Sequence, residues 1–137
     1  MDLTMKLELV PVPVSDVDRA KAFYADKLGF VQDVDVEPAP GVRIVQLTPP
    51  GSACSIVLST GLGNLADMGA GTGAGTVHGL HLVVDGLDTA RDELIGRGVE
   101  VGAIDDVGGG VRYAAISDPD GNTFVLQEMS WRTGDAY

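Results

Sequence analysis

One order of secondary-structure signals occurs twice in the chain, and this internal repeat constrains the fold more than any other feature. In each half, a strand-like apolar run precedes an amphipathic helical stretch, and three short strand-like runs follow. Asp18 and Asp88 are 70 positions apart, whereas the helix-ending glycines, Gly29 and Gly98, are 69 apart. The repeat therefore predicts two β-α-β-β-β modules and an α+β fold.

The predicted elements follow from alternation, helical stripes and turn residues. In the first half we expect strands over residues 7–14, 31–36, 43–48 and 54–59, and a helix over 15–28 capped by Ser15. In the second half we expect strands over residues 80–84, 99–104, 111–117 and 123–128, and a capped helix over 85–98 that ends at Gly98. On the helical stripe of the first module, Tyr24 is expected in the core.

The chain of 137 residues is long enough for one domain with a buried core. We divide it into module one (6–60), a glycine-rich linker (61–78), module two (79–129) and a tail (130–137). The linker also contains a Gly-x-Gly sequence, but no helical stripe follows it, so a phosphate-binding loop is not expected.

Composition excludes several classes of partner and location. The formal net charge of -11 leaves no basic face for a nucleic-acid backbone. No apolar run is long enough for a membrane span, so a membrane partner is not expected either. Cys54 is the single cysteine, which excludes a disulfide framework and favours a reducing, cytoplasmic location.

Two segments, SDVDRAKAFYADKLGF (15–30) and SDPDGNTFVLQE (117–128), carry a family resemblance together with the paired modules. They resemble the vicinal oxygen chelate superfamily, which includes glyoxalase I, extradiol dioxygenases, fosfomycin resistance enzymes and bleomycin resistance proteins. The resemblance covers residues 6–129. It implies that each module curls into half of a cupped mixed sheet. It also implies that the two halves form a central cleft, either within one chain or between two swapped chains, and that the protein is a homodimer.

The resemblance also implies where a divalent metal would bind. Its enzymes use His or Glu in the first strand of a module and Glu in the last strand, which places the four positions at Leu9, Ser55, Gly79 and Val125. None of these side chains holds a divalent cation in the usual way. We therefore expect no metal and no cofactor, and a neighbouring histidine, His81, lacks carboxylate partners.

Alternation along the strands predicts which side chains face the cleft and which pack under the helices. Cys54, Ile56, Leu58, Phe124 and Leu126 are expected to be buried. The expected ligand-binding residues are Leu9, Arg43, Val45, Ser55, Val57, His81, Tyr113, Val125, Gln127 and Trp131. Trp131 is expected either to stack on the ligand or to pack against a partner chain.

Three functions remain open at this point. The first is a metal-free protein that sequesters a bulky hydrophobic or aromatic natural product or antibiotic, in the manner that the resemblance to bleomycin resistance proteins implies. The second is a natural-product tailoring enzyme with His81 and Tyr113 as candidate catalytic residues and Arg43 as a further acid–base candidate. The third is a metal-dependent lyase or dioxygenase.

Overall fold

The computed structural model describes residues 3–60 and 73–131. Most of the predicted glycine-rich linker and all of the tail after Trp131 lie outside the described residues. The chain divides into two compact units, Met1–Thr76 and Val77–Tyr137. We describe each unit by itself.

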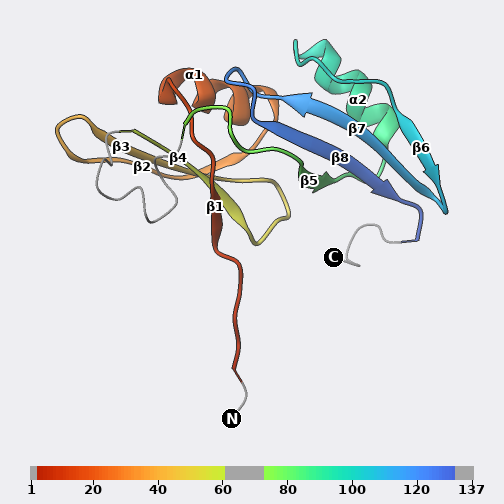
Figure 1. The fold of residues 1–137 in the computed structure, drawn as a ribbon, viewed down its shortest axis with the longest axis horizontal. Helices are drawn as coiled ribbons and strands as arrows, with labels where there is room; N and C mark the ends of the chain where they lie inside the picture. Colours follow the sequence, from red (N-terminus) through yellow and green to blue (C-terminus); the bar gives the residue numbers. More distant parts are fainter. Residues whose placement is uncertain (1–2, 61–72, 132–137) are drawn as a thin grey trace. The chain divides into compact units, whose positions relative to one another are not determined.

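The first unit contains one four-stranded mixed sheet and one helical segment (Figure 1). Its elements are β1 (Leu9–Pro11), α1 (Val17–Lys21), the π-helix η1 (Ala22–Lys27), β2 (Val31–Ala39), β3 (Val42–Thr48) and β4 (Ser55–Thr60). The strand order is β1-β4-β3-β2. β1 runs parallel to β4, while β3 is antiparallel to both β4 and β2.

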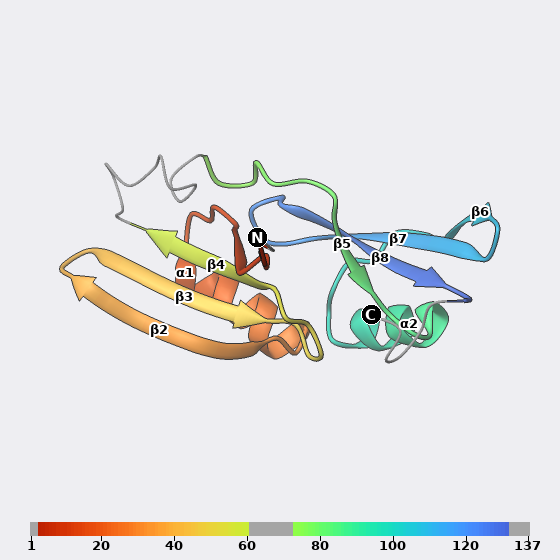
Figure 2. The same ribbon diagram turned by 90° about the horizontal axis from the view of Figure 1, so that it is seen from below.

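The second unit repeats this arrangement (Figure 2). Its elements are β5 (Leu80–Val83), α2 (Leu87–Gly96), β6 (Asp105–Gly108), β7 (Val111–Ser117) and β8 (Thr123–Met129). The strand order is β5-β8-β7-β6, with β5 parallel to β8 and the other neighbours antiparallel. Strand order and strand direction therefore match between the units, which confirms the predicted pair of β-α-β-β-β modules.

The N-cap of the first helical segment lies one residue later than predicted, and α1 begins at Val17. Asp16, and not Ser15, is the N-cap: its side chain accepts a hydrogen bond of 3.1 Å from the backbone N–H of Arg19. The segment then widens into η1, where the N–H of Leu28 donates to the carbonyl of Phe23 at 3.1 Å. Tyr24 is fully buried, as predicted from its place on the helical stripe.

Each helical segment packs on one face of its own sheet, and the core of the unit lies between them. The buried sheet residues on this helix-covered face are Val45, Leu47, Ile56 and Leu58 in the first unit and Ala114, Ile116, Phe124 and Leu126 in the second. Burial of Ile56, Leu58, Phe124 and Leu126 confirms the predicted core positions, whereas Cys54 precedes β4 and is only half-buried.

Two predicted strands differ from the observed ones. The segment 99–104 contributes only a single bridge, from Val101 to Ile116, and the strand follows at β6. The side chain of Arg91 on α2 donates to the carbonyls of Val101 and Gly102, so these carbonyls bond to a helix side chain and not to a neighbouring strand. β1 is shorter than its alternating sequence because proline has no N–H to donate within the run 7–14.

In the described parts of the chain, no helix is both long and apolar enough to cross a membrane.

Candidate ligand-binding faces

Each sheet has a second face that its helix does not cover, and we call it the open face. Register decides which residues lie there, because directly paired residues of neighbouring strands project to the same side. On the first sheet, the open-face residues of β1, β3 and β4 are Leu9, Pro11, Ile44, Gln46, Thr48, Ser55, Val57 and Ser59. Val31, Val34 and Val36 of β2 continue this face, and all three are exposed.

The prediction that Arg43 and Val45 share a face with Ser55 and Val57 is wrong. Val45 pairs with Leu58, on the helix-covered side, and its side chain is fully buried. The same pairing places Arg43 on that side too. Leu9, Ser55 and Val57 do lie together on the open face, where Leu9 is the direct partner of Ser55.

The length of the turn before the last strand explains this error. Two residues separate β3 from Gly51, whereas three separate β7 from Gly121. Matching β3 to β7 by distance from the turn glycine therefore shifts the alignment of β3 by one residue. Because side chains alternate between the two faces of a sheet, a shift of one residue assigns every side chain of the strand to the wrong face. The structural counterpart of Arg43 is Arg112, 69 positions further along, and not Tyr113.

Arg43 holds the first helix against the first sheet. It donates to Asp18 of α1 with 2.5 Å between Nη1 and Oδ1, and to Asp35 of β2 through Nε at 2.9 Å and Nη2 at 2.8 Å. Lys21 also donates to Asp35, at 2.7 Å. The hydrogen bonds from Arg43 and then from Lys21 hold the pKa of Asp35 well below its ordinary value of 3.8.

The second unit has the matching arrangement. Arg112 donates from Nη2 to Asp88 of α2 and from Nε to Glu128 of β8, both at 2.8 Å. The pKa of Asp88 is lowered, chiefly by its hydrogen bond from Arg112. The pKa of Glu128 is also lowered, first by the backbone N–H of Leu87 and then by Arg112. Glu128 therefore belongs to the helix-covered face, as its alternation with Val125 predicts.

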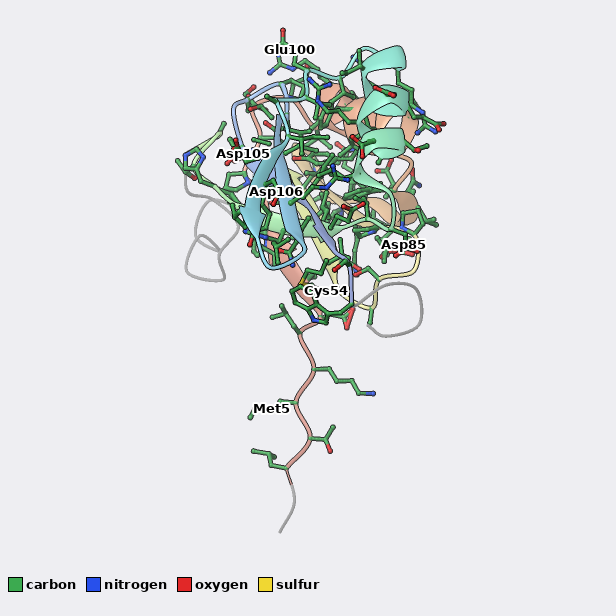
Figure 3. All side chains as sticks on the ribbon, turned by 90° about the vertical axis from the view of Figure 1, so that its right-hand side faces the viewer. Met5, Cys54, Asp85, Glu100, Asp105 and Asp106 are labelled. Atoms are coloured by element: carbon green, nitrogen blue, oxygen red, sulfur yellow. The ribbon has the colours of Figure 1, made fainter. Side chains whose placement is uncertain are left out.

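The open face of the second sheet brings together most of the candidates from that half. His81 pairs with Val125, Val125 with Ala115, and Tyr113 with Gln127. Thus His81, Tyr113, Val125 and Gln127 lie on one side of the sheet. Asp105 of β6 pairs with Tyr113 and carries an exposed carboxylate to the same face (Figure 3).

His81 is the centre of a polar cluster on this face. Its Nδ1 lies 2.5 Å from Oε1 of Gln127. Its ring meets the ring of Tyr113 edge to face, with 5.5 Å between the centroids and 87° between the planes. The other histidine, His78, lies with its Nδ1 3.3 Å from the hydroxyl of Thr123.

The positions at which the family resemblance implies a metal do not fit one. Leu9 and Ser55 are adjacent on β1 and β4, but a leucine provides no donor atom and the Ser55 hydroxyl is engaged with Thr48 at 2.7 Å. The expected position at Gly79 is wrong, because Gly79 precedes β5 and the register pairs His81 with Val125 just as it pairs Leu9 with Ser55. His81 is therefore the counterpart of Leu9, and one imidazole beside a valine does not hold a divalent cation in the usual way. Across residues 3–60 and 73–131, no three His, Cys, Asp or Glu residues are grouped as a metal site would require.

Trp131 follows β8 and is largely exposed, at 62%. It lies beside Gly110, whose turn is closed by a hydrogen bond from the N–H of Ser130 to the Gly110 carbonyl at 2.9 Å. It therefore presents an exposed aromatic side chain just after the strand that carries Val125 and Gln127.

Sequence reasoning missed the contribution of β3 to the open face of the first sheet. Ile44, Gln46 and Thr48 lie there in place of Arg43 and Val45. Equivalent residues of β3 and β7 are 69 positions apart, as the helix-ending glycines are, and not 70. Aligning the two strands with the 69-residue spacing would have identified these three residues.

Comparisons with known proteins agree with this architecture. The family model of the Glyoxalase/Bleomycin resistance protein/Dioxygenase superfamily matches residues 6–126. No curated protein matches the sequence. The solved structure of TnmS3, an antibiotic binding protein from Streptomyces sp. CB03234, is 33% identical with a TM-score of 0.79, and the match covers 95% of this chain and 100% of that one.

Two further solved structures are similar. A glyoxalase/bleomycin resistance protein from Streptomyces sp. CB03234 is 34% identical, with a TM-score of 0.73 over 90% of this chain and 100% of that one. A superfamily member from Sphaerobacter thermophilus DSM 20745 is 31% identical, with a TM-score of 0.74 over 91% and 98%. The chain belongs to the Glyoxalase/Bleomycin resistance protein/Dioxygenase superfamily.

Proposed function

We propose that this protein binds and sequesters a bulky hydrophobic or aromatic compound, such as a natural product or antibiotic, without a metal. The observation that carries the proposal is the composition of the open faces. They combine exposed or half-buried apolar side chains with a few hydrogen-bonding groups. The register places one histidine and no carboxylate at the metal-ligand positions of the fold, because His81 pairs with Val125 as Leu9 pairs with Ser55. Such a surface suits a flat organic molecule.

The comparisons support the binding part of this proposal. One similar structure is that of a protein described as antibiotic binding, and it matches nearly the whole chain. A sequestering protein in a producing organism would confer self-resistance. The proposal places the protein in the cytoplasm, where the single thiol of Cys54 stays reduced.

Affinity would come mainly from apolar area removed from water, at about 25 cal/mol per Å² before the costs of association are subtracted. On the second sheet, Val83 and Val125 offer apolar area beside the ring of Tyr113. The polar tips of His81 and Gln127 would then fix the orientation of the ligand.

A thermal-shift screen of polycyclic and aromatic compounds, with and without divalent cations, tests the proposal. We expect hits that do not depend on metal, and mass spectrometry should recover the bound compound unchanged. Val83→Asp, on the open face, should weaken binding by tenfold or more. Ile95→Asp on α2 is the matched control, because its side chain has similar exposure (45% against 38%) and lies on a helix.

A second candidate function is a metal-independent enzyme that modifies such a compound. The observation that favours it is the contact between two titratable rings, His81 and Tyr113, on the open face. Multiple turnovers of a bound compound, abolished by His81→Ala or Tyr113→Phe, would establish the enzyme and overturn sequestration.

The proposal includes a homodimer. Leu3, Met5 and Leu7 alternate along an extended segment before β1 and are 69–82% exposed, and Figure 3 shows Met5 projecting from this segment. β1 is also an edge strand of its sheet, and an exposed edge with apolar neighbours favours pairing with a second copy. Light scattering at micromolar concentration should give twice the chain mass, and Met5→Lys with Leu7→Lys should shift it toward the monomer. A monomer mass for the unmodified protein would overturn this part.

A further inference from the structure

We infer that His81 presents an unprotonated Nε2 on the open face of the second sheet, and that this nitrogen accepts a hydrogen bond from an aromatic hydroxyl group of the ligand. The inference rests on the proposed binding function and adds the chemical class of the ligand. Its starting point is the 2.5 Å contact between Nδ1 of His81 and Oε1 of Gln127.

The contact determines the tautomer of the imidazole. An amide oxygen can only accept a hydrogen bond, so Nδ1 must carry the proton that it donates to Gln127. A neutral imidazole has one N–H and one bare nitrogen, and Nε2 is therefore an acceptor. No described residue donates to this Nε2, and the side chain of His81 is exposed.

The surroundings select the kind of donor. The ring of Tyr113 and the side chain of Val125 lie on the same face, and both favour an aromatic ligand body. The neighbouring carboxylate of Asp105 and the net charge of -11 disfavour a carboxylate ligand. A neutral ring that carries a hydroxyl group satisfies all of these features, because the hydroxyl donates to Nε2 and the ring covers apolar area.

The tautomer can be tested without any ligand. Nitrogen-15 NMR of the protein should show a protonated Nδ1 and a bare Nε2 for the neutral His81 ring. Gln127→Ala removes the acceptor and should redistribute the ring toward the other tautomer, whereas His78 should be unaffected. A protonated Nε2 in the unmodified protein would overturn the inference.

Binding of a matched pair of probes tests the ligand class. We expect 2-naphthol to bind about five- to tenfold more tightly than 2-methoxynaphthalene, since the ether covers similar area but cannot donate. His81→Phe should abolish this preference while retaining an aromatic ring. The control, His78→Phe, makes the same replacement at the other histidine and should leave the preference intact.

The outcomes separate this inference from the proposed function. Equal binding of both probes to the unmodified protein, or a preference that survives in His81→Phe, would overturn the inference and leave the binding function standing. Failure of both probes to bind would count against the inference and the binding function together.

Discussion

Arg112 on β7 donates to Asp88 on α2 at 2.8 Å, and Arg43 on β3 donates in the same way to Asp18 on α1. Each arginine also bonds a carboxylate on a neighbouring strand, which is Glu128 for Arg112. Each copy of the module thus has one strand arginine that forms an ion pair with an aspartate of the helix.

Replacing Arg112 by methionine should lower the melting temperature by a few degrees. The substitution leaves Glu128, whose side chain is only 19% exposed, without its charged partner, and it removes the link to α2. Thermal unfolding followed by circular dichroism measures the change. Arg97→Met is the control, because the ion pair of Arg97 at the C-cap of α2 with Glu93 is exposed and its loss should have little effect.

Stability should fall on acidification below about pH 4. The pKa values of Asp35 and Glu128 are lowered in the folded protein from ordinary values of 3.8 and 4.5. The stabilisation is therefore fully present above those ordinary values and is lost as the pH falls toward the lower folded-state values. Urea unfolding at a series of pH values measures the slope. The double variant Asp35→Asn with Glu128→Gln should flatten it, and an unchanged slope would contradict the assignment.

Leu47→Ala should destabilise the protein by about 2–5 kcal/mol, because Leu47 is fully buried between β3 and the first helical segment. Gln46→Ala, one residue earlier and on the open face, should change stability by less than about 0.5 kcal/mol. Chemical denaturation of both variants tests whether Leu47 faces the core and Gln46 the open face. Equal effects would contradict it.

Asn122→Ala should cost about 1–3 kcal/mol, because it leaves buried polar groups unpaired. Asn122 is fully buried, accepts from the N–H of Val77 at 3.0 Å and donates to Asp118 at 2.8 Å. Chemical denaturation measures the loss. Ser52→Ala in the corresponding turn of the first unit is the comparison, and it should cost less because Ser52 is exposed and its hydroxyl bonds to the backbone of nearby Cys54.

Dialysis against a chelator should leave the melting temperature unchanged, and elemental analysis should find no stoichiometric transition metal. The reason is chemical, since the register places Leu9, Ser55, His81 and Val125 at the positions of the metal ligands, and one imidazole without a carboxylate makes a poor site. About one metal ion per chain, released together with a loss of stability, would be the opposite result.

Much of this protein could be predicted from the repeat and from alternation within single strands. The duplicated order of elements predicted two β-α-β-β-β modules, and the family resemblance implied that they form mixed sheets. In the second unit, alternation also predicted that His81, Tyr113, Val125 and Gln127 share a face, and register in the structure places them together. The contacts of His81 with Gln127 and Tyr113 were not predictable, because side chains on different strands meet only through tertiary pairing.

The sequence by itself determined the two modules and the order of their elements. The tertiary structure decided that His81, and not Gly79, is the counterpart of Leu9. Only the tertiary structure decided which face of the first sheet receives Arg43 and Val45. Alternation determines which residues of one strand share a side, but register between strands determines which side that is. Register depends on turn length, and the one-residue difference before Gly51 and Gly121 is enough to move Val45 from the expected ligand-binding face into the core.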